Sequence, residues 1–464
     1  MASALLRWMV CLALFLTASC SSRPEGTCEH DSQCKGALVC FEKKCISVMQ
    51  VRELRKVREE AAKPKVCEDK DGDGAKVGEG CPPGTPKDCN DNDPNMAPGK
   101  DELCDAIDNN CDGRINEGQR GCVQTVFGGA SWGNQAEHRL LNPHGVLYDP
   151  QGFVLLSDDH HIWKINPESG QVEVFAGSQV SNFENGAKDV ARFSYPQGMA
   201  RADNGDLYVA DCKNNCIRRI AQNGVVSTLA GMCSNRTKDS GQIADGPKDV
   251  ARFYCPTDVA VAPDGSVVVV DRENARIRRV TQDGTVTTIA GVGPVEVEEG
   301  KGQIGFQDGK ALEARFNDPQ SVLVDPRGII FVAESFNCRI RRIDPKKGGQ
   351  GEVSTFVGDS DTLLGVGGFA DGAGKKVRFN FPHGMTYDRS GNMIVADLGN
   401  NVIRLVTPAG SVRTLYGKAG DGKVALDGPI AQARFQAPSD VAVGPNGTLF
   451  VVDAVANRLR WIVP

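Results

Sequence analysis

Six segments of the chain repeat one pattern, and this repetition restricts the fold more than any other feature. The fullest copy begins at Asp245-Gly-Pro-Lys-Asp-Val-Ala-Arg-Phe and continues through Pro256 into the apolar run Val267–Val270, the run Arg276–Val280 and the run Val286–Ala290. The other copies are centred on Pro143, Pro196, Pro319, Pro382 and Pro438. A repeat of roughly 40 to 60 residues with four short strands is typical of a propeller blade, and the blades must stack because none can bury its own faces.

The two ends of the repeat region predict how the ring closes. The last copy stops after its third strand, at Arg460-Trp-Ile-Val-Pro464, and the missing fourth strand matches Val123-Gln-Thr-Val-Phe127, before the first copy. An N-terminal strand that completes the last blade would remove the open sheet edges. The sequence therefore predicts an all-β fold over residues 123–464, a six-bladed β-propeller closed by an N-terminal strand and preceded by small disulfide-rich modules.

These motifs resemble those of the NHL-repeat family of propellers. The resemblance rests on the Asp-Gly…Ala-Arg-Phe-x-x-Pro segment, the Tyr208-Val-Ala-Asp211 strand, the Asn-x-x-Ile-Arg-Arg-Ile strand and the Val-x-Thr-x-Ala-Gly strand, and it covers about residues 122–464. It implies a six-bladed propeller. Members of the family include binding modules, protein-interaction platforms, sensor domains and some enzymes, so the resemblance implies less about activity.

The N-terminus predicts export. Arg7 precedes the apolar run Trp8 to Leu16, which is too short to span a membrane as a mature helix, so residues 1–19 are interpreted as a signal peptide. The segment resembles a bacterial lipoprotein signal, and this implies lipidation of Cys20 and an anchor in the cell envelope, with the outer membrane as the expected location. The alternative is ordinary cleavage near Ser19, which would give a soluble secreted protein.

The 17 cysteines agree with export, because disulfides form in oxidising compartments. Residues 20–45 hold the lipid-anchor region and a four-Cys module, residues 46–66 a charged helical spacer, and residues 67–122 a six-Cys module. Six cysteines allow 15 pairings, so the connectivity stays open. In the propeller, Cys212, Cys216, Cys233 and Cys255 are expected to form disulfides rather than a zinc site, and Cys338 is left as a free thiol.

The six-Cys module contains the clearest candidate for metal chemistry. Asp and Asn alternate on turning loops and supply the oxygen ligands that calcium needs. The candidate ligands are Asp69, Asp71, Asp73, Asp88, Asn90, Asp91, Asp93, Asp108, Asn110 and Asp112. The alternatives are a softer metal, or an acidic linker whose Asp and Asn only cap turns. About residues 67–118 resemble a metal-binding motif of secreted bacterial proteins, some of which are linked to copper.

Internal repetition separates structural residues from functional ones, because the scaffold needs a structural residue in every blade. An Arg stands four residues before each blade proline, and an acid ends each second strand. We interpret each Arg as structural, linked to the acid or to a carbonyl group of its own blade. The residues after the blade proline differ between blades. His144, His383 and Asp440 come from three adjacent blades and form the candidate channel-mouth site, the alternative being polar residues that only line the channel.

The net charge of the chain limits the kinds of partner that it can bind. The formal net charge of −6 and a pI of about 5.7 make nucleic acid an unsuitable partner. We therefore expect a non-enzymatic binding or scaffold protein with a calcium-binding stalk and a propeller face for a protein or small-molecule ligand, held at the membrane only by a lipid anchor. The alternative is a metal-dependent propeller lyase or lactone hydrolase with its site at the channel mouth.

Overall fold

The computed structural model describes the propeller at residues 121–129, 139–233, 243–292, 305–359 and 367–464. It also describes the backbone of 38–41 and 44–47 and scattered residues between 69 and 111. The expected signal peptide, Cys20 and residues 48–66 of the helical spacer lie outside the described residues, and the first two spacer residues, Ile46 and Ser47, belong to a strand instead of a helix. The chain divides into two units, Met1–Ala97 and Pro98–Pro464. In the first unit, β1 (Leu38–Phe41) pairs with β2 (Lys44–Ser47), which places Cys40 opposite Cys45.

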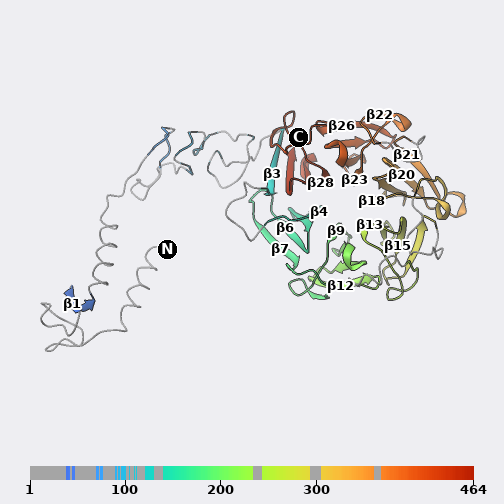
Figure 1. Cartoon of the computed structure of the whole chain (residues 1–464), viewed down its shortest axis with the longest axis horizontal. Helices are drawn as coiled ribbons and strands as arrows, with labels where there is room; N and C mark the ends of the chain where they lie inside the picture. The colour runs from blue at the N-terminus through green and yellow to red at the C-terminus, as the bar shows by residue number, and fades with distance from the viewer. Residues whose placement is uncertain are drawn as a thin grey trace. The chain divides into compact units, whose positions relative to one another are not determined.

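The second unit contains six antiparallel sheets of four or five strands, arranged as the blades of a ring (Figure 1). The innermost strands are β4 (Pro143–Asp149), β9 (Pro196–Arg201), β13 (Pro256–Val261), β18 (Pro319–Val324), β23 (Pro382–Tyr387) and β28 (Pro438–Val443). The second strands are β5 (Phe153–Asp158), β10 (Leu207–Asp211), β14 (Val267–Asp271), β19 (Ile330–Glu334), β24 (Met393–Asp397) and β29 (Leu449–Asp453).

The two outer strands of each blade complete the sheets. The third strands are β6 (His161–Ile165), β11 (Cys216–Ile220), β15 (Arg276–Val280), β20 (Arg339–Asp344), β25 (Val402–Val406) and β30 (Arg458–Val463). The fourth strands are β7 (Val172–Gly177), β12 (Val225–Ala230), β16 (Val286–Ala290), β21 (Glu352–Val357), β26 (Ser411–Gly417) and β3 (Cys122–Gly128). Four blades add a two-residue strand at the rim, namely β8 (Gly186–Ala187), β17 (Gly309–Lys310), β22 (Gly372–Ala373) and β27 (Gly428–Pro429).

Short 3-10 helices are the only helices among the described residues. They are η3 (Cys212–Asn214), η5 (Ala311–Glu313), η6 (Lys347–Gly349), η7 (Gly374–Lys376), η8 (Leu398–Asn400) and η9 (Pro445–Gly447). Apolar side chains form six buried clusters, and each cluster draws on two neighbouring blades. The blades therefore stabilise one another by burying their faces in pairs, as the repeat predicted.

The predicted closure of the ring is confirmed. β3 pairs with β30 of the last blade, with Val123 opposite Ile462 and Thr125 opposite Arg460. β27 then pairs with β3 on its other side. The chain before the first blade thus supplies the fourth strand of the last blade, and neither strand is left with an unpaired edge.

A buried arginine in the third strand, rather than the arginine before the blade proline, binds the acid of each blade from the second to the sixth. The N···O distances are 2.7–2.9 Å for Arg218–Asp211, Arg278–Asp271, Arg341–Glu334, Arg404–Asp397 and Arg460–Asp453, and all ten side chains are buried. The expected link to the acid is therefore wrong in its choice of arginine. The carbonyl alternative holds for Arg252, which donates to Val250 O at 2.5 Å.

Candidate functional site

The residues that follow the blade prolines converge on one small cavity at the centre of the ring. Its volume is about 20 Å³, which is room for one water molecule or ion. The cavity is lined by His144, Gly145, Gln197, Gly198, Thr257, Asp258, Gln320, Ser321, His383, Gly384 and Asp440. All three side chains of the candidate channel-mouth site therefore border the same space.

Asp440 has a structural role as well as a place in the cavity wall. Its Oδ2 accepts the N–H of Val146 in the first blade, and its Oδ1 accepts the N–H of Val441, both at 2.8 Å. Asp258 does the same between the third and fourth blades, where it accepts the N–H groups of Val322 at 2.9 Å and Val259 at 2.8 Å. Both carboxylates thus join adjacent blades by hydrogen bonds to backbone amides.

Glycine is required in the blade before each of these acids. A Cβ atom at Gly198 would overlap the Asp258 carboxylate, and a Cβ atom at Gly384 would overlap that of Asp440. The Gly198–Asp258 and Gly384–Asp440 pairs are therefore explained by close packing of neighbouring innermost strands, without any ligand. Asp258 was not included in the candidate site, although it occupies in the third blade the position that Asp440 has in the sixth.

Burial controls the protonation of the cavity residues. Desolvation, with smaller contributions from the nearby His383 and Arg272, lowers the pKa of His144 to about 4. Desolvation also lowers the pKa of His383 to about 4, although its hydrogen bond to the Ser439 carbonyl acts in the opposite direction. Burial raises the pKa of Asp258 to about 6, and burial together with the charge of Asp258 raises the pKa of Asp440 well above its usual range. At neutral pH both imidazoles are therefore uncharged.

One ring nitrogen of His383 already has a partner. Its Nδ1 lies 2.8 Å from the carbonyl oxygen of Ser439, so in the neutral ring Nδ1 carries the proton and donates it. The lone pair on Nε2 is then the group that can accept a hydrogen bond or bind a metal. Within the described parts of the chain, however, no three His, Cys, Asp or Glu side chains are arranged to hold a metal ion. The cavity therefore offers polar contacts, not a complete ligand set.

The loops around the cavity differ from blade to blade. In the first blade, His160 Nε2 lies 3.5 Å from Asp159. In the third blade, Arg272 Nε donates to Asp318 at 2.6 Å. Cys216–Cys233 lies at the second blade and Cys212–Cys255 links it to the start of the third, so the prediction of disulfides here is confirmed. Cys338 is free and buried, as expected.

The described parts of the six-Cys module are turns. Asp69 Oδ1 accepts the N–H of Gly72 at 2.7 Å, and the carbonyl oxygen of Asn90 accepts the N–H of Asp93 at 3.0 Å. Six of the ten candidate ligands lie outside the described residues, namely Asp73, Asp88, Asp91, Asp108, Asn110 and Asp112. The donor set is composed of carboxylate and amide oxygens, so it suits a hard cation better than copper.

A disulfide joins this module to the propeller. Cys104 pairs with Cys122, which is the first residue of the closing strand β3 and is fully buried. The N–H of Gly121 donates to the Val463 carbonyl, and the N–H of Ile430 donates to the Gly121 carbonyl, both at 2.8 Å. Cys104 is therefore covalently attached to the strand that closes the ring.

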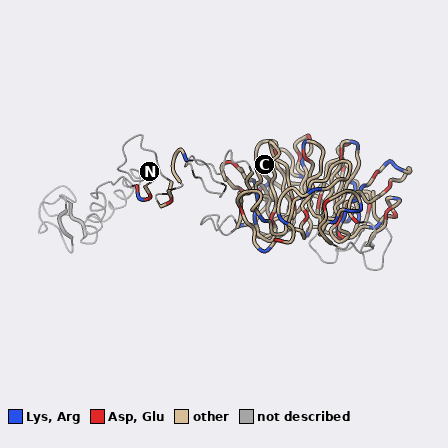
Figure 2. The backbone as a smooth tube through the Cα atoms, turned by 90° about the horizontal axis from the view of Figure 1, so that it is seen from above, with Lys and Arg blue, Asp and Glu red and all other residues tan. Residues whose placement is uncertain are grey.

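Basic and acidic residues are interspersed over the propeller, and neither sign gathers on one side (Figure 2). Among the described residues, no helix has the length and apolar character needed to cross a bilayer.

Two family models match the chain. Residues 180–407 match the Teneurin NHL domain, and residues 88–117 match the metal-binding motif of the Cu-binding MopE model. The second match includes Cys104 and seven of the ten candidate metal ligands, Asp88, Asn90, Asp91, Asp93, Asp108, Asn110 and Asp112.

Curated relatives match a large part of the chain. NHL repeat-containing protein 2 of Homo sapiens is 26% identical over 350 residues, which are 69% of this chain and 46% of that protein. Protein SUPPRESSOR OF QUENCHING 1, chloroplastic, of Arabidopsis thaliana is 28% identical over 250 residues, which are 50% of this chain and 23% of that protein. The chain thus spans less than half the length of these relatives.

Solved structures share the fold. A protein of unknown function from Bacteroides thetaiotaomicron has a TM-score of 0.54 and 18% identity, with 73% of this chain and 75% of that chain covered. An auxiliary nutrient binding protein from the same organism has a TM-score of 0.52 and 15% identity, again with 73% of this chain and 75% of that chain covered. At these identities the likeness concerns the fold alone.

Proposed function

We propose that this chain, whose propeller is of the NHL-repeat type and follows a metal-binding motif, is an exported binding protein anchored to the cell envelope by a lipid on Cys20. The N-terminal modules form a stalk that binds calcium, and the propeller presents a protein or small-molecule ligand at the entrance of its central channel. The observation that carries the proposal is the small polar cavity at the ring centre. There the residues that differ between blades meet, whereas the buried Arg–acid pairs repeat in five blades.

Several features support export and the stalk. The disulfides Cys104–Cys122, Cys212–Cys255 and Cys216–Cys233 are characteristic of an oxidising compartment. The nutrient-binding proteins among the structural neighbours share the fold, and a binding role is compatible with it. The oxygen-rich donor set of the matched motif favours calcium.

The polarity of the cavity favours binding over catalysis. Two uncharged imidazoles and two amides, Gln197 and Gln320, present neutral hydrogen-bond donors and acceptors, whereas the carboxylates of Asp258 and Asp440 are occupied by backbone amides. Asp440, the acid that would serve as a base, is engaged by two backbone amides. A ligand at this entrance would be recognised by neutral hydrogen bonds.

Export and anchoring are tested in a bacterial host that expresses the full chain. The mature N-terminal peptide should begin at Cys20 and carry a diacylglyceryl group in mass spectrometry of the membrane fraction, and Cys20→Ser should release the protein from that fraction. An N-terminus elsewhere and a protein that stays soluble would refute the anchor but not the binding role.

The alternative function is a metal-dependent lyase or lactone hydrolase. It is favoured by the two neutral imidazoles that border one cavity, because neutral His is a metal ligand and a general base. A transition metal that is retained by the purified chain and lost in His144→Ala/His383→Ala would support this alternative.

A further inference from the structure

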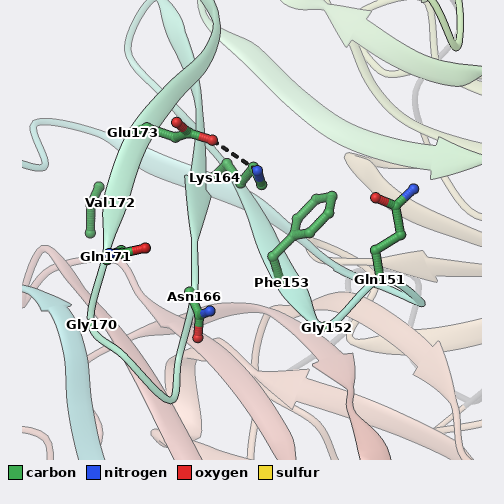
Figure 3. Close-up of a pocket in the computed structure, with 9 residues that line it drawn as sticks. All are labelled: Gln151, Gly152, Phe153, Lys164, Asn166, Gly170, Gln171, Val172 and Glu173. Carbon is green, nitrogen blue, oxygen red and sulfur yellow. Dashed lines mark hydrogen bonds and ion pairs between the residues drawn. The ribbon is translucent and has the colours of Figure 1, made fainter. Parts of the chain in front are cut away.

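A second cavity lies in the first blade, at the opposite end of the strands from the channel-mouth residues. Pro143 pairs with Asp158 at one end of the β4–β5 pair, and Asp149 pairs with Phe153 at the other. The cavity has a volume of about 630 Å³ and is lined by Gln151, Gly152, Phe153, Lys164, Asn166, Gly170, Gln171, Val172 and Glu173 (Figure 3). It thus lies between the β4–β5 turn and the β6–β7 turn, on the other face of the propeller.

Side chains fill the corresponding space in the next two blades. Arg219 pairs with Asp206 at 2.7 Å in the second blade, and Arg279 donates to Ser266 Oγ at 2.8 Å in the third. The turn glutamines add to this: Gln222 packs on Gly205, and Gln282 donates to the Gly265 carbonyl. In the second and third blades, these side chains therefore connect the strands to the adjacent turns across the space that is open in the first blade.

The first blade lacks both of these contacts. Phe153 stands at the position of Asp206, and Lys164, at the position of Arg219, places its Nζ 4.9 Å from the Phe153 ring centroid. The β6–β7 turn is closed on itself, because Asn166 Oδ1 accepts the N–H groups of Glu168 at 3.0 Å and Ser169 at 3.1 Å. No atom of the described residues would lie within 4 Å of a Cβ atom built on Gly152. The open space at the β4–β5 turn is shared with the fourth and fifth blades, where no described atom lies within 4 Å of a Cβ atom built on Gly328 or Gly391. The Lys164–Glu173 ion pair beside Phe153 is particular to the first blade, and the scaffold does not need it.

The cavity carries no net charge. Lys164 Nζ and Glu173 Oε1 are 2.8 Å apart, so the one cation and the one anion of the wall neutralise each other (Figure 3). The amides of Gln151 and Gln171 each offer a donor and an acceptor, and Phe153 and Val172 supply apolar surface. Such a wall suits a ligand with adjacent hydroxyl groups and apolar C–H faces, and the volume is in the usual range for small-molecule sites.

We propose that this cavity binds a neutral saccharide of one or two rings. Gln151 and Gln171 donate to and accept from its hydroxyl groups, and the Lys164–Glu173 pair contacts a further hydroxyl group. The site is separate from the channel entrance and goes beyond the function proposed above, so either can fail without the other.

The test uses the full mature chain, titrated with glucose, maltose, cellobiose and lactose by calorimetry and saturation-transfer NMR. Glucuronate and glucosamine serve as charged counterparts. We expect at least one neutral sugar to bind, and Gln151→Ala/Gln171→Ala to weaken its binding at least tenfold. The matched turn variant of the second blade, Gln222→Ala, should leave the affinity unchanged.

A second experiment changes the charge of the cavity wall. Lys164→Gln leaves Glu173 without its cation, so this variant should gain affinity for glucosamine relative to glucose. The proposal is overturned if none of the four neutral sugars binds, if the double glutamine variant binds as tightly as the wild type, or if a charged sugar is preferred by the wild type.

Discussion

Asp440 Oδ2 accepts the backbone N–H of Val146 at 2.8 Å, although 294 residues separate them in sequence. This hydrogen bond joins the innermost strands of the last and first blades. At the outer edge, β3, which precedes the first blade in the sequence, completes the sheet of the last blade. Asp440→Ala leaves the N–H groups of Val146 and Val441 without this acceptor, at a cost of roughly 1–3 kcal/mol each. Chemical denaturation should show the loss, and Asp258→Ala should show a similar one. An Asp440→Ala protein as stable as the wild type would contradict this role.

The closing strand is the second test of the ring. Deletion of residues 121–129 should expose the edges of β30 and β27 and cause aggregation, because unpaired edges recruit other chains. Size-exclusion chromatography and thermal unfolding check this. A deletion variant that stays monomeric with an unchanged melting temperature would disprove closure by β3.

The Cys104–Cys122 disulfide should hold β3 in place, and the chain contains a matched control. Cys104–Cys122 and Cys216–Cys233 close loops of similar length, with sequence separations of 18 and 17. Loop entropy predicts a loss of about 3 kcal/mol for either removal. Only Cys104→Ser/Cys122→Ser, and not Cys216→Ser/Cys233→Ser, should also speed amide hydrogen exchange in residues 122–128. Equal exchange in both variants would show that the disulfide does not hold the strand.

The neutral imidazoles predict a dependence on pH. The folded-state pKa values of His144 and His383 are lowered to about 4 by burial, so the unfolded chain binds the protons more tightly. The stabilisation is complete above about pH 6.5, the unfolded value, and is lost as the pH falls towards 4, at roughly 3 kcal/mol for each His. His144→Gln/His383→Gln should lose less stability than the wild type between pH 7 and 5 in urea titrations. Parallel losses would indicate ordinary pKa values.

The sequence predicted the ring, its closure and the strand order, because each blade repeats a local pattern and the ends of the repeat show where a strand is missing. It did not predict which arginine binds the acid of each blade. Arg192 and Arg218 belong to the same repeat copy as Asp211, so the sequence does not distinguish between them. Only the pairing of β10 with β11 shows that Arg218 lies on the same face as Asp211 and binds it.

The candidate site was predicted in part. The positions of His144, His383 and Asp440 near the blade prolines were enough to predict that they border one cavity. The innermost strands all begin at these prolines, around the ring centre. The role of Asp440 as a bridge between blades depends on its contact with Val146 and could not be seen in the repeat. The Cys104–Cys122 pairing likewise required the fold, since six cysteines allow 15 pairings.

Calcium is expected to stabilise the N-terminal module. At a hundredfold excess over the dissociation constant, binding to the folded state alone adds about 2.7 kcal/mol. Asp69→Asn/Asp71→Asn/Asp93→Asn should reduce the heat of calcium binding in calorimetry, and the exposed propeller acid Asp189, changed to Asn, is the control. Unchanged heats in the triple variant would remove these residues from the ligand set.

Elemental analysis of the purified, dialysed full chain tests the proposed function most directly, because it separates a binding propeller from a metal-dependent enzyme. The binding account predicts calcium that is lost with the triple Asp variant, and no transition metal whose content depends on His144 and His383. One equivalent of zinc or another transition metal that disappears in His144→Ala/His383→Ala would contradict the binding account and support the enzyme.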